Sequence, residues 1–228
     1  MIVTVKDLWK TYIMGENTVD ALKGVDLELS AGDFVSVAGP SGSGKTTMMN
    51  IVGLIDKPTK GSVTIDGRET TQLDRHALAK MRRELIGFIF QSFNLLPVLN
   101  VYENVELPLV IGKNPGSKAE RRDWILHLLE QVGLADRRDH TPAELSGGQQ
   151  QRVAIARALV SHPKIVIADE PTANLDSENG ERVLALMKKV NQEDKTTFIF
   201  STHDSKIWEM ADHVIFLHDG SISSETHK

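Results

Sequence analysis

The chain has 228 residues, of which 40% are hydrophobic and 25% are charged, and its formal net charge is −5. This composition is that of a globular protein with one domain or two subdomains. The absence of cysteine excludes disulfides and thiolate metal sites, and the negative charge argues against nucleic acid as a partner. The N-terminus lacks signal-peptide features and no apolar run is long enough to span a bilayer, so we expect a soluble chain without direct membrane insertion.

The first elements are predicted strands in which apolar and polar residues alternate. Ile2–Val5, Val25–Leu29 and Val63–Ile65 have this period of two, which is typical of a half-exposed antiparallel sheet. Tyr12 lies between the first two strands and precedes a predicted loop, Met14–Thr18. An aromatic ring beside a nucleotide site can stack on a base. Packing on an edge strand is the default role of such a residue.

A continuous apolar strand, Phe34–Ala38, leads into the glycine-rich segment Gly39–Thr47, and a helix is predicted over Thr47–Leu54. The segment fits G-x-x-x-x-G-K-[ST], and strand, loop and helix are the context in which this motif binds phosphates. Glycines let backbone N–H groups turn inward, and the helix N-terminus favours an anion. The motif predicts that Lys45 reaches the outer phosphates of a nucleoside triphosphate and that Thr46 binds Mg²⁺. The predicted nucleotide-binding residues are Gly39, Pro40, Ser41, Gly42, Ser43, Gly44, Lys45, Thr46 and Thr47.

Four further apolar runs suit parallel strands that are covered on both faces. They are Ile86–Phe90, Ile165–Ala168, Phe198–Phe200 and Val214–Leu217. Helix patterns alternate with them and begin at Asp74 and Ser177. This is the α/β arrangement in which ligands bind at the carboxyl ends of the strands.

The segment from about Asn100 to Val160 lacks a strand pattern. The predicted helices are Val101–Ile111, interrupted at Pro108, then Lys118–Val132 and Gly147–Val160, with loops at Gly112–Ser117 and Asp139–Ala143. We therefore expect a nucleotide-binding core made of residues 1–92 and 161–228, with residues 93–160 inserted as a helical subdomain. The polar tail Ser221–Lys228 is expected to fray.

Two segments in the second half carry candidate chemistry. Ile165–Glu170 is an apolar strand that ends in two carboxylates, where Asp169 can hold Mg²⁺ and Glu170 can accept a proton from an attacking water. Ser146 is a predicted N-cap followed by two glycines, which makes a second place where free N–H groups can meet an anion. One nucleotide does not need two phosphate cradles, and an ordinary capped helix would explain Ser146 equally well.

Leu145–Gln149, followed by Gln150–Arg157, resembles the signature motif of ATP-binding cassette (ABC) ATPases. Together with Gly39–Thr46 and Ile165–Glu170, in this order, the resemblance covers essentially the whole chain. It implies an α/β P-loop NTPase fold with a parallel core sheet, an N-terminal antiparallel β subdomain and an inserted helical subdomain. It also implies a Mg²⁺-dependent ATPase in which two subunits pair head to tail. The residues that would then face the partner's ATP are Leu145, Ser146, Gly147, Gly148 and Gln149.

The resemblance assigns roles to four further residues. Gln91 matches the Q-loop, which touches the metal and water, and His203 matches the switch histidine at the γ-phosphate. Asp176 matches the D-loop, although this chain has Ala-Asn-Leu-Asp where the family usually has Ser-Ala-Leu-Asp. Tyr12 falls at the adenine-stacking position. The implied catalytic residues are Glu170, His203, Gln91 and Lys45, and the implied metal ligands are Thr46, Gln91 and Asp169.

Within the family, the segments Tyr12–Glu16, Ile51–Thr59 and Phe90–Pro97 resemble a bacterial branch. That branch contains lipoprotein-releasing (LolD-like), macrolide-exporter and FtsE-type cell-division ATPases. The resemblance implies a homodimeric subunit on the cytoplasmic face of the inner membrane that drives a separate integral membrane permease. The implied activity is most like lipoprotein release from the inner membrane or a related export or mechanotransmission system. A cell-division-type ATPase, which signals to a membrane partner without transport, is the alternative. A soluble ABC ATPase acting on DNA or ribosomes fits less well, because such proteins usually have coiled-coil insertions or tandem cassettes.

Overall fold

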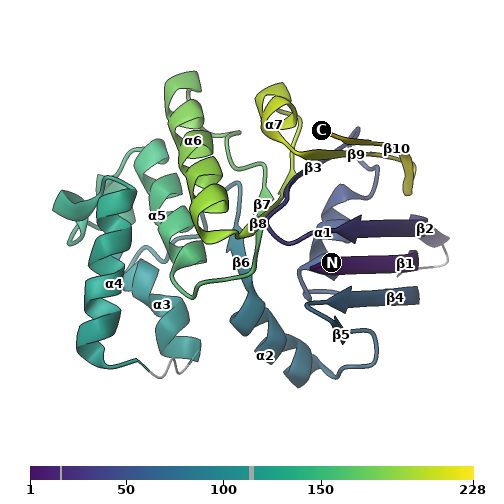
Figure 1. Cartoon of the computed structure of the whole chain (residues 1–228), viewed down its shortest axis with the longest axis horizontal. Helices are drawn as coiled ribbons and strands as arrows, with labels where there is room; N and C mark the ends of the chain where they lie inside the picture. The colour runs from purple at the N-terminus through teal and green to yellow at the C-terminus, as the bar shows by residue number, and fades with distance from the viewer. Residues whose placement is uncertain (16, 113–115) are drawn as a thin grey trace.

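Four strands form an antiparallel sheet at one end of the molecule. The computed structural model describes residues 1–15, 17–112 and 116–228, so parts of the predicted loops Met14–Thr18 and Gly112–Ser117 lie outside the described residues. The strands are β1 (Val3–Met14), β2 (Asn17–Leu29), β4 (Lys60–Ile65) and β5 (Arg68–Glu69), in the order β2-β1-β4-β5. This sheet lies on the right in Figure 1, and it confirms the antiparallel pattern expected from the alternating residues.

A second, six-stranded sheet forms the centre of the molecule. Its strands are β3 (Phe34–Ala38), β6 (Ile86–Ile89), β7 (Ile165–Asp169), β8 (Thr197–Ser201), β9 (His213–His218) and β10 (Ser221–His227). The order is β10-β9-β3-β8-β7-β6. Pairing is parallel from β9 to β6, as the continuous apolar runs predicted, and only β10 is antiparallel.

The helices fall into two groups around this sheet (Figure 1). Those of the core are α1 (Lys45–Val52), α2 (Arg75–Leu85), α6 (Ser177–Asp194) and α7 (Ser205–Met210). Those between β6 and β7 are α3 (Val101–Gly112), α4 (Lys118–Gln131) and α5 (Gly147–Leu159), with short 3₁₀ turns at Ala135–Arg137 and Pro142–Glu144. The second group lies at the end of the molecule opposite the antiparallel sheet, as an inserted helical subdomain.

Each parallel strand contributes alternate residues to two separate cores. Phe34 and Val166 pack in a core with the helical subdomain and α6. Val35 and Ile165, their chain neighbours, pack on the other side with α1, α2 and the antiparallel sheet. Both faces of the parallel part of the central sheet are therefore covered, which is why the parallel strands contain few polar residues.

Three details differ from the sequence-based expectations. The tail does not fray: Ser221–His227 forms β10, because its backbone groups pair with β9 along its length. The helix α3 continues through Pro108, since Val105 and Leu109 on either side are buried in the core and hold both halves in place. The helix α1 begins at Lys45 rather than Thr47, because Gly44 takes a left-handed conformation and caps the helix inside the motif.

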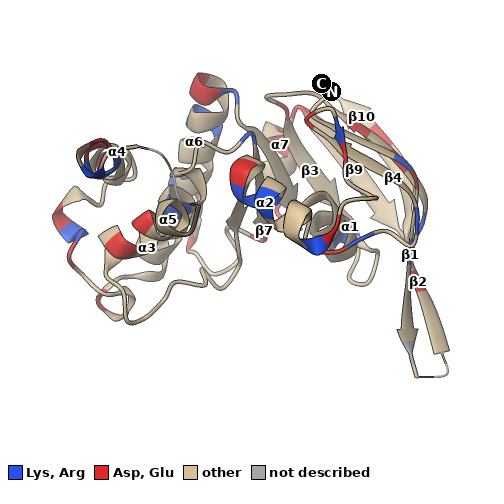
Figure 2. Cartoon of the chain, turned by 90° about the horizontal axis from the view of Figure 1, so that it is seen from below, with Lys and Arg blue, Asp and Glu red and all other residues tan. Residues whose placement is uncertain are grey.

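Lys and Arg do not gather on one face of the ribbon but are interspersed with Asp and Glu (Figure 2). Within the described ranges, no helix combines the length and the apolar character that a bilayer-spanning segment requires.

Candidate functional site

The carboxyl ends of four parallel strands meet at one edge of the central sheet. The loops that follow β3, β6, β7 and β8 begin there, and they surround a cleft of about 480 Å³. The cleft is lined by Ser41–Thr47, Gln91, Asp169, Glu170 and His203, together with residues of β2 and the β9–β10 turn. The structure thus brings together residues that are up to 201 positions apart in the sequence (19 to 220), at the place where open α/β sheets bind ligands.

Two glycines of the phosphate-loop motif are required by close backbone contacts. Gly39 has a φ of 144°, and a Cβ at this position would lie 2.1 Å from the carbonyl oxygen of Leu217. Gly44 has a φ of 104°, and its Cβ would lie 2.5 Å from the carbonyl oxygen of Ala21. The loop is therefore enclosed by β2 and β9, and a side chain at either glycine would push it out of position.

Lys45 is folded back over the loop at the start of α1. Its Nζ donates to the carbonyl oxygens of Gly39 at 2.7 Å and Pro40 at 2.9 Å. Only 8% of the residue is exposed. Burial lowers the pKa of Lys45, and the carboxylates of Glu170 and Asp169 oppose that shift. The α1 N-terminus has no side-chain cap, so its first N–H groups remain available to an anion in the same cleft.

Glu170 is held in a strained conformation at the end of β7. Its φ is 45°, and its N–H donates to the carbonyl oxygen of Ser201 at 2.8 Å. Thr202 Oγ1 donates to Glu170 Oε2 at 3.2 Å, and His203 Nε2 lies 3.7 Å from Glu170 Oε1. Backbone strain of this kind is concentrated at functional sites. Asp169, the neighbouring carboxylate, lines the same cleft.

Gln91 lines the cleft from the end of β6, and two contacts fix the chain around it. Asn174 Nδ2 donates to the Gln91 carbonyl oxygen at 2.8 Å. The Arg157 guanidinium of α5 donates to the carbonyl oxygens of Phe93 and Asn94, both at 2.6 Å. Burial lowers the pKa of Arg157. The loop after Gln91 is thus tied to the helix that follows the predicted signature.

The signature residues lie apart from the cleft. Ser146 caps α5: its Oγ accepts from Gln149 N–H at 3.3 Å, while Gln149 Oε1 accepts from Ser146 N–H at 2.9 Å. Leu145 is buried. Gly148 packs so closely on Asn179 that an added Cβ would lie 2.8 Å from its Cγ. Among the described residues that line the cleft, none belongs to Leu145–Gln149.

Two further predicted residues occupy the surroundings of the site. Asp176 is the N-cap of α6 and accepts from the N–H of Asn179 at 3.0 Å. Tyr12, on β1, pairs in register with Val19, which lines the cleft, but Tyr12 is not among the described lining residues. Its hydroxyl donates to Asp56 Oδ2 at 3.0 Å.

Sequence reasoning missed several parts of the site. Asp20 and Lys23 of β2 and Asp219 of the β9–β10 turn line the cleft. Gly220 N–H donates to the carbonyl oxygen of Ser43 at 3.1 Å, and Thr202 positions Glu170. No motif marks these residues, because they reach the site through strand pairing between distant segments. The dipeptide Asp219–Gly220, which follows an apolar run, was the one available sequence signal for the β9–β10 turn.

Comparisons with known proteins agree with this geometry. The profile of the ABC transporter family matches residues 22–173. The ABC transporter ATP-binding protein MJ0796 of Methanocaldococcus jannaschii is 50% identical over 226 residues, which are 98% of this chain and 96% of that protein. The macrolide export ATP-binding/permease protein MacB of Bdellovibrio bacteriovorus is 46% identical over 98% of this chain, which spans only 34% of MacB.

Solved structures show the same fold. The dimeric post-hydrolysis structure of MJ0796 bound to ADP and phosphate has a TM-score of 0.91 and 49% identity, covering 99% of this chain and 98% of that one. A cbiO1 structure from Clostridium perfringens has a TM-score of 0.87 at 30% identity, covering 99% of this chain and 88% of that one. The resemblance noted in the sequence is confirmed, and the chain belongs to the ABC transporter family as an ATP-binding cassette.

Proposed function

We propose that this chain is the ATP-hydrolysing subunit of an ABC transporter complex. The observation that carries the proposal is the convergence of Lys45, the uncapped start of α1 and the carboxylates of Asp169 and Glu170 on one cleft. A triphosphate fits the cationic loop, and the carboxylates stand where a metal and an attacking water are needed. The solved MJ0796 cassette, which holds ADP and phosphate, supports the choice of nucleotide.

The residues across the cleft suit Mg²⁺. Thr46, Gln91 and Asp169 offer a hydroxyl, an amide and a carboxylate, which are the oxygen donors that this ion prefers, and all three line the cleft. We propose that these residues hold the ion, which supplies charge neutralisation for the β- and γ-phosphates when it is bound.

The chain's own groups account for the remaining chemistry. The loop N–H groups and Lys45 stabilise charge on the γ-phosphate. The Glu170 carboxylate orients the attacking water and accepts its proton. We propose that His203, whose Nε2 lies 3.7 Å from Glu170 Oε1, contacts the γ-phosphate. The hydrogen bond from Thr202 keeps Glu170 in position. We propose further that Tyr12 contacts the adenine from β1, beside Val19 at the edge of the cleft.

We propose that two copies close around two nucleotides. Ser146 and Gly148 stand at a helix N-terminus outside the chain's own cleft, so in this assembly they meet a nucleotide held by another copy. Asp176 caps the neighbouring α6 beside this helix tip and belongs to the same contact. The dimeric MJ0796 structures support such a pair.

We propose that the membrane partner docks beside Gln91. A groove of about 310 Å³ opens between β6 and the helical subdomain and is lined by Phe88, Phe90 and Ile111, among others. Leu96 and Val98, in the loop after Gln91, are exposed apolar residues. An apolar patch of this kind suits a helix of a permease. Residues 93–160 would then move relative to residues 1–92 and 161–228 and transmit ATP binding to the permease.

The permease is proposed to be a separate subunit. Export of the lipoprotein-releasing or macrolide type is the favoured activity, since MacB is a relative over almost the whole chain. Copurification with a membrane protein, followed by a transport assay in vesicles, distinguishes this activity from signalling of the cell-division type.

Substitution of the general base tests the ATPase. Glu170→Gln is expected to lower ATP turnover by at least ~10²-fold, the usual size of general-base effects, while ATP still binds. Steady-state phosphate release and fluorescent-nucleotide binding measure the two quantities. Glu130→Gln, on the exposed face of α4, is the matched control and should behave like the parent. Normal turnover in Glu170→Gln would contradict the assignment.

A further inference from the structure

Two histidines and one glutamate gather on the C-terminal hairpin, away from the nucleotide cleft. The antiparallel register of β9 and β10 places His213 directly opposite His227. Side chains alternate between the two faces of a strand, so Glu225, two residues before His227, shares its face. Strand pairing alone therefore brings two imidazoles and a carboxylate to one place.

The three side chains of this cluster lie close enough together to share one ion. His213 Nε2 lies 2.6 Å from Glu225 Oε1, and His227 Nε2 lies 3.6 Å from the same oxygen. One ligand atom from each residue falls within 4.8 Å of the other two. Metal–ligand bonds of about 2.0–2.1 Å in a tetrahedral site place donor atoms roughly 3.3 Å apart. Small rotations of the exposed His227 and Glu225 side chains suffice to reach that arrangement.

The buried histidine lacks the hydrogen bonds that its burial calls for. His213 is 1% exposed, and its Nδ1 has no hydrogen-bond partner among the residues that the structure describes. Its Nε2 lies 2.6 Å from Glu225 Oε1, which is a direct contact between two of the three groups. An unsatisfied buried nitrogen is costly, so it calls for a partner.

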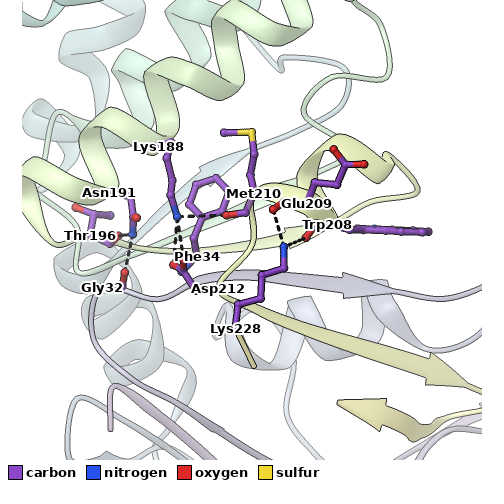
Figure 3. Close-up of polar contacts among 10 residues, drawn as sticks. All are labelled: Gly32, Phe34, Lys188, Asn191, Thr196, Trp208, Glu209, Met210, Asp212 and Lys228. Carbon is purple, nitrogen blue, oxygen red and sulfur yellow. Dashed lines mark hydrogen bonds and ion pairs between the residues drawn. The ribbon is translucent and has the colours of Figure 1, made fainter. Parts of the chain in front are cut away.

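The ends of both strands are anchored next to the cluster (Figure 3). Lys228 N–H donates to the Asp212 carbonyl oxygen at 2.9 Å, and its Nζ donates to the carbonyl oxygens of Trp208 and Glu209 at 3.1 and 2.6 Å. Lys188 Nζ donates to Asp212 Oδ1 at 3.1 Å. These contacts hold the residues that flank His213 and His227, so the ligand groups are fixed before an ion arrives.

We propose that His213, Glu225 and His227 bind a divalent transition-metal ion, Zn²⁺ in the first place. Two imidazoles and one carboxylate match the ligand types of Zn²⁺, whereas Mg²⁺ and Ca²⁺ take oxygen ligands. The His227 side chain is 67% exposed, which leaves an entry path and room for water in the fourth position. Because β9 also lines the phosphate loop at Leu217, an ion here clamps the hairpin that supports that loop.

Metal titration of the nucleotide-free full chain tests the proposal. Excess Mg²⁺ is included to occupy the oxygen ligands of the nucleotide cleft. Isothermal titration is expected to show one Zn²⁺ per chain, and Co²⁺ is expected to give the visible absorption bands of a tetrahedral site. His227→Gln and Glu225→Gln should each weaken Zn²⁺ binding by at least ~10²-fold, because even loss of an outer-shell partner costs about 10–100-fold. His76→Gln, exposed on α2, is the matched control and should bind as the parent does.

Thermal unfolding gives an independent readout. Zn²⁺ should raise the Tm of the parent and of His76→Gln but not that of His227→Gln, since an ion that binds the folded state alone stabilises it. Both ligand substitutions are at side chains that are at least one-third exposed, so the variants should fold. Absence of Zn²⁺ binding at micromolar concentration, or equal binding by His227→Gln, would overturn the proposal and leave a hydrogen-bonding cluster in its place.

Discussion

Single residues decide whether the phosphate loop can form. Gly39 has its left-handed φ and its close approach to the Leu217 carbonyl at the same position. The pattern G-x-x-x-x-G-K-[ST] identified this residue from the sequence, but only the fold shows that β9 is what excludes a side chain there. The motif thus identifies the glycines locally, whereas the contact that requires Gly39 is made by a strand about 180 residues later (39 to 217).

Gly39→Ala tests that contact. The new Cβ would lie 2.1 Å from a backbone oxygen, so the loop or β9 must shift. We expect a loss of about 1–3 kcal/mol in the free energy of unfolding, the scale of a strained backbone conformation, and a clear loss of ATP affinity. Urea unfolding and nucleotide titration measure both. Gly112→Ala is the control, since its Cβ would meet nothing within 4 Å and its φ is not left-handed. Equal stability of the two variants would count against the contact.

Asp56 links the nucleotide-side strand β1 to the segment after α1. Desolvation raises the pKa of Asp56, but hydrogen bonds from Lys10, the Lys57 backbone and Tyr12 outweigh it, so the net shift is downward from 3.8. A lowered folded-state pKa contributes stability that is present above 3.8 and is lost as the pH falls through the folded-state value.

Asp56→Asn should therefore destabilise the protein at neutral pH and lose that effect in acid. The expected loss in the free energy of unfolding at neutral pH is about 1 kcal/mol. Hydrogen bonds to a charged group contribute more than this when buried, and the partial exposure of Asp56 reduces their contribution. Urea unfolding at neutral pH and at a pH below 3.8 measures the difference. Asp123→Asn, exposed on α4, is the control. A parent–variant difference that does not shrink in acid would refute this account of the Lys10–Asp56 contact.

Among the elements, α5 connects the two halves of the proposed machinery. Its N-terminus carries Ser146, and its last turn carries Arg157, which donates to the carbonyl oxygens of Phe93 and Asn94. Both of these loop residues have left-handed φ values of 60° and 50°. One guanidinium with several donors can hold two such carbonyls at once, which an ammonium at a single point does less well.

Arg157→Lys and Arg157→Met should release the loop after Gln91. We expect about 2 kcal/mol less stability in Arg157→Met, the scale of hydrogen bonds from a charged donor, and a smaller loss in Arg157→Lys. ATP turnover should fall while ATP affinity stays close to the parent value, because Gln91 is affected and the phosphate loop is not. Arg122→Met, exposed on α4, is the control. An Arg157→Met variant with parent stability and turnover would show that the two carbonyls do not need this partner.

Element existence and type were largely predictable, and element ends were not. Strands buried on both faces were recognisable as apolar runs, and the N-cap at Ser146 marked the start of α5. β10 escaped prediction because its residues are polar and exposed, so its stability comes from pairing with β9 rather than from a buried face. Pro108 predicted a break that tertiary packing of α3 overrides. The cleft residues of β2 could not be predicted either, since no motif marks them and only the strand topology brings them to the site.

At the scale of the whole molecule, the two proposed phosphate-binding segments do not face each other. The loop at Lys45 opens into the cleft, while the capped helix tip at Ser146 lies outside the described lining of that cleft. A monomer leaves the second cradle without a ligand. A head-to-tail pair uses both. This arrangement predicts how a mixture of two variant subunits should behave.

Ser146→Asp is designed to remove the second cradle without unfolding the helix. Asp is as good an N-cap as Ser and suits the helix dipole, but its charge repels a partner's γ-phosphate. We expect ATP turnover to fall by at least ~10²-fold, the scale of lost electrostatic stabilisation of a transition state. Ser117→Asp makes the same change at the capped start of α4 and should leave turnover unchanged.

Mixing two inactive variants separates a shared site from two independent ones. Lys45→Ala disables the phosphate loop of one copy, and Ser146→Asp disables the helix tip of the other. In a mixed pair, one site then contains two disabled parts and the other contains an intact Lys45 loop facing an intact Ser146. Turnover should therefore reappear on mixing, although each variant alone is inactive. The control mixture of Lys45→Ala with Glu170→Gln keeps one loop intact but places the lost carboxylate in that same site, so it should stay inactive. Absence of ATP turnover in the first mixture, with both variants folded and able to pair, would refute the shared site.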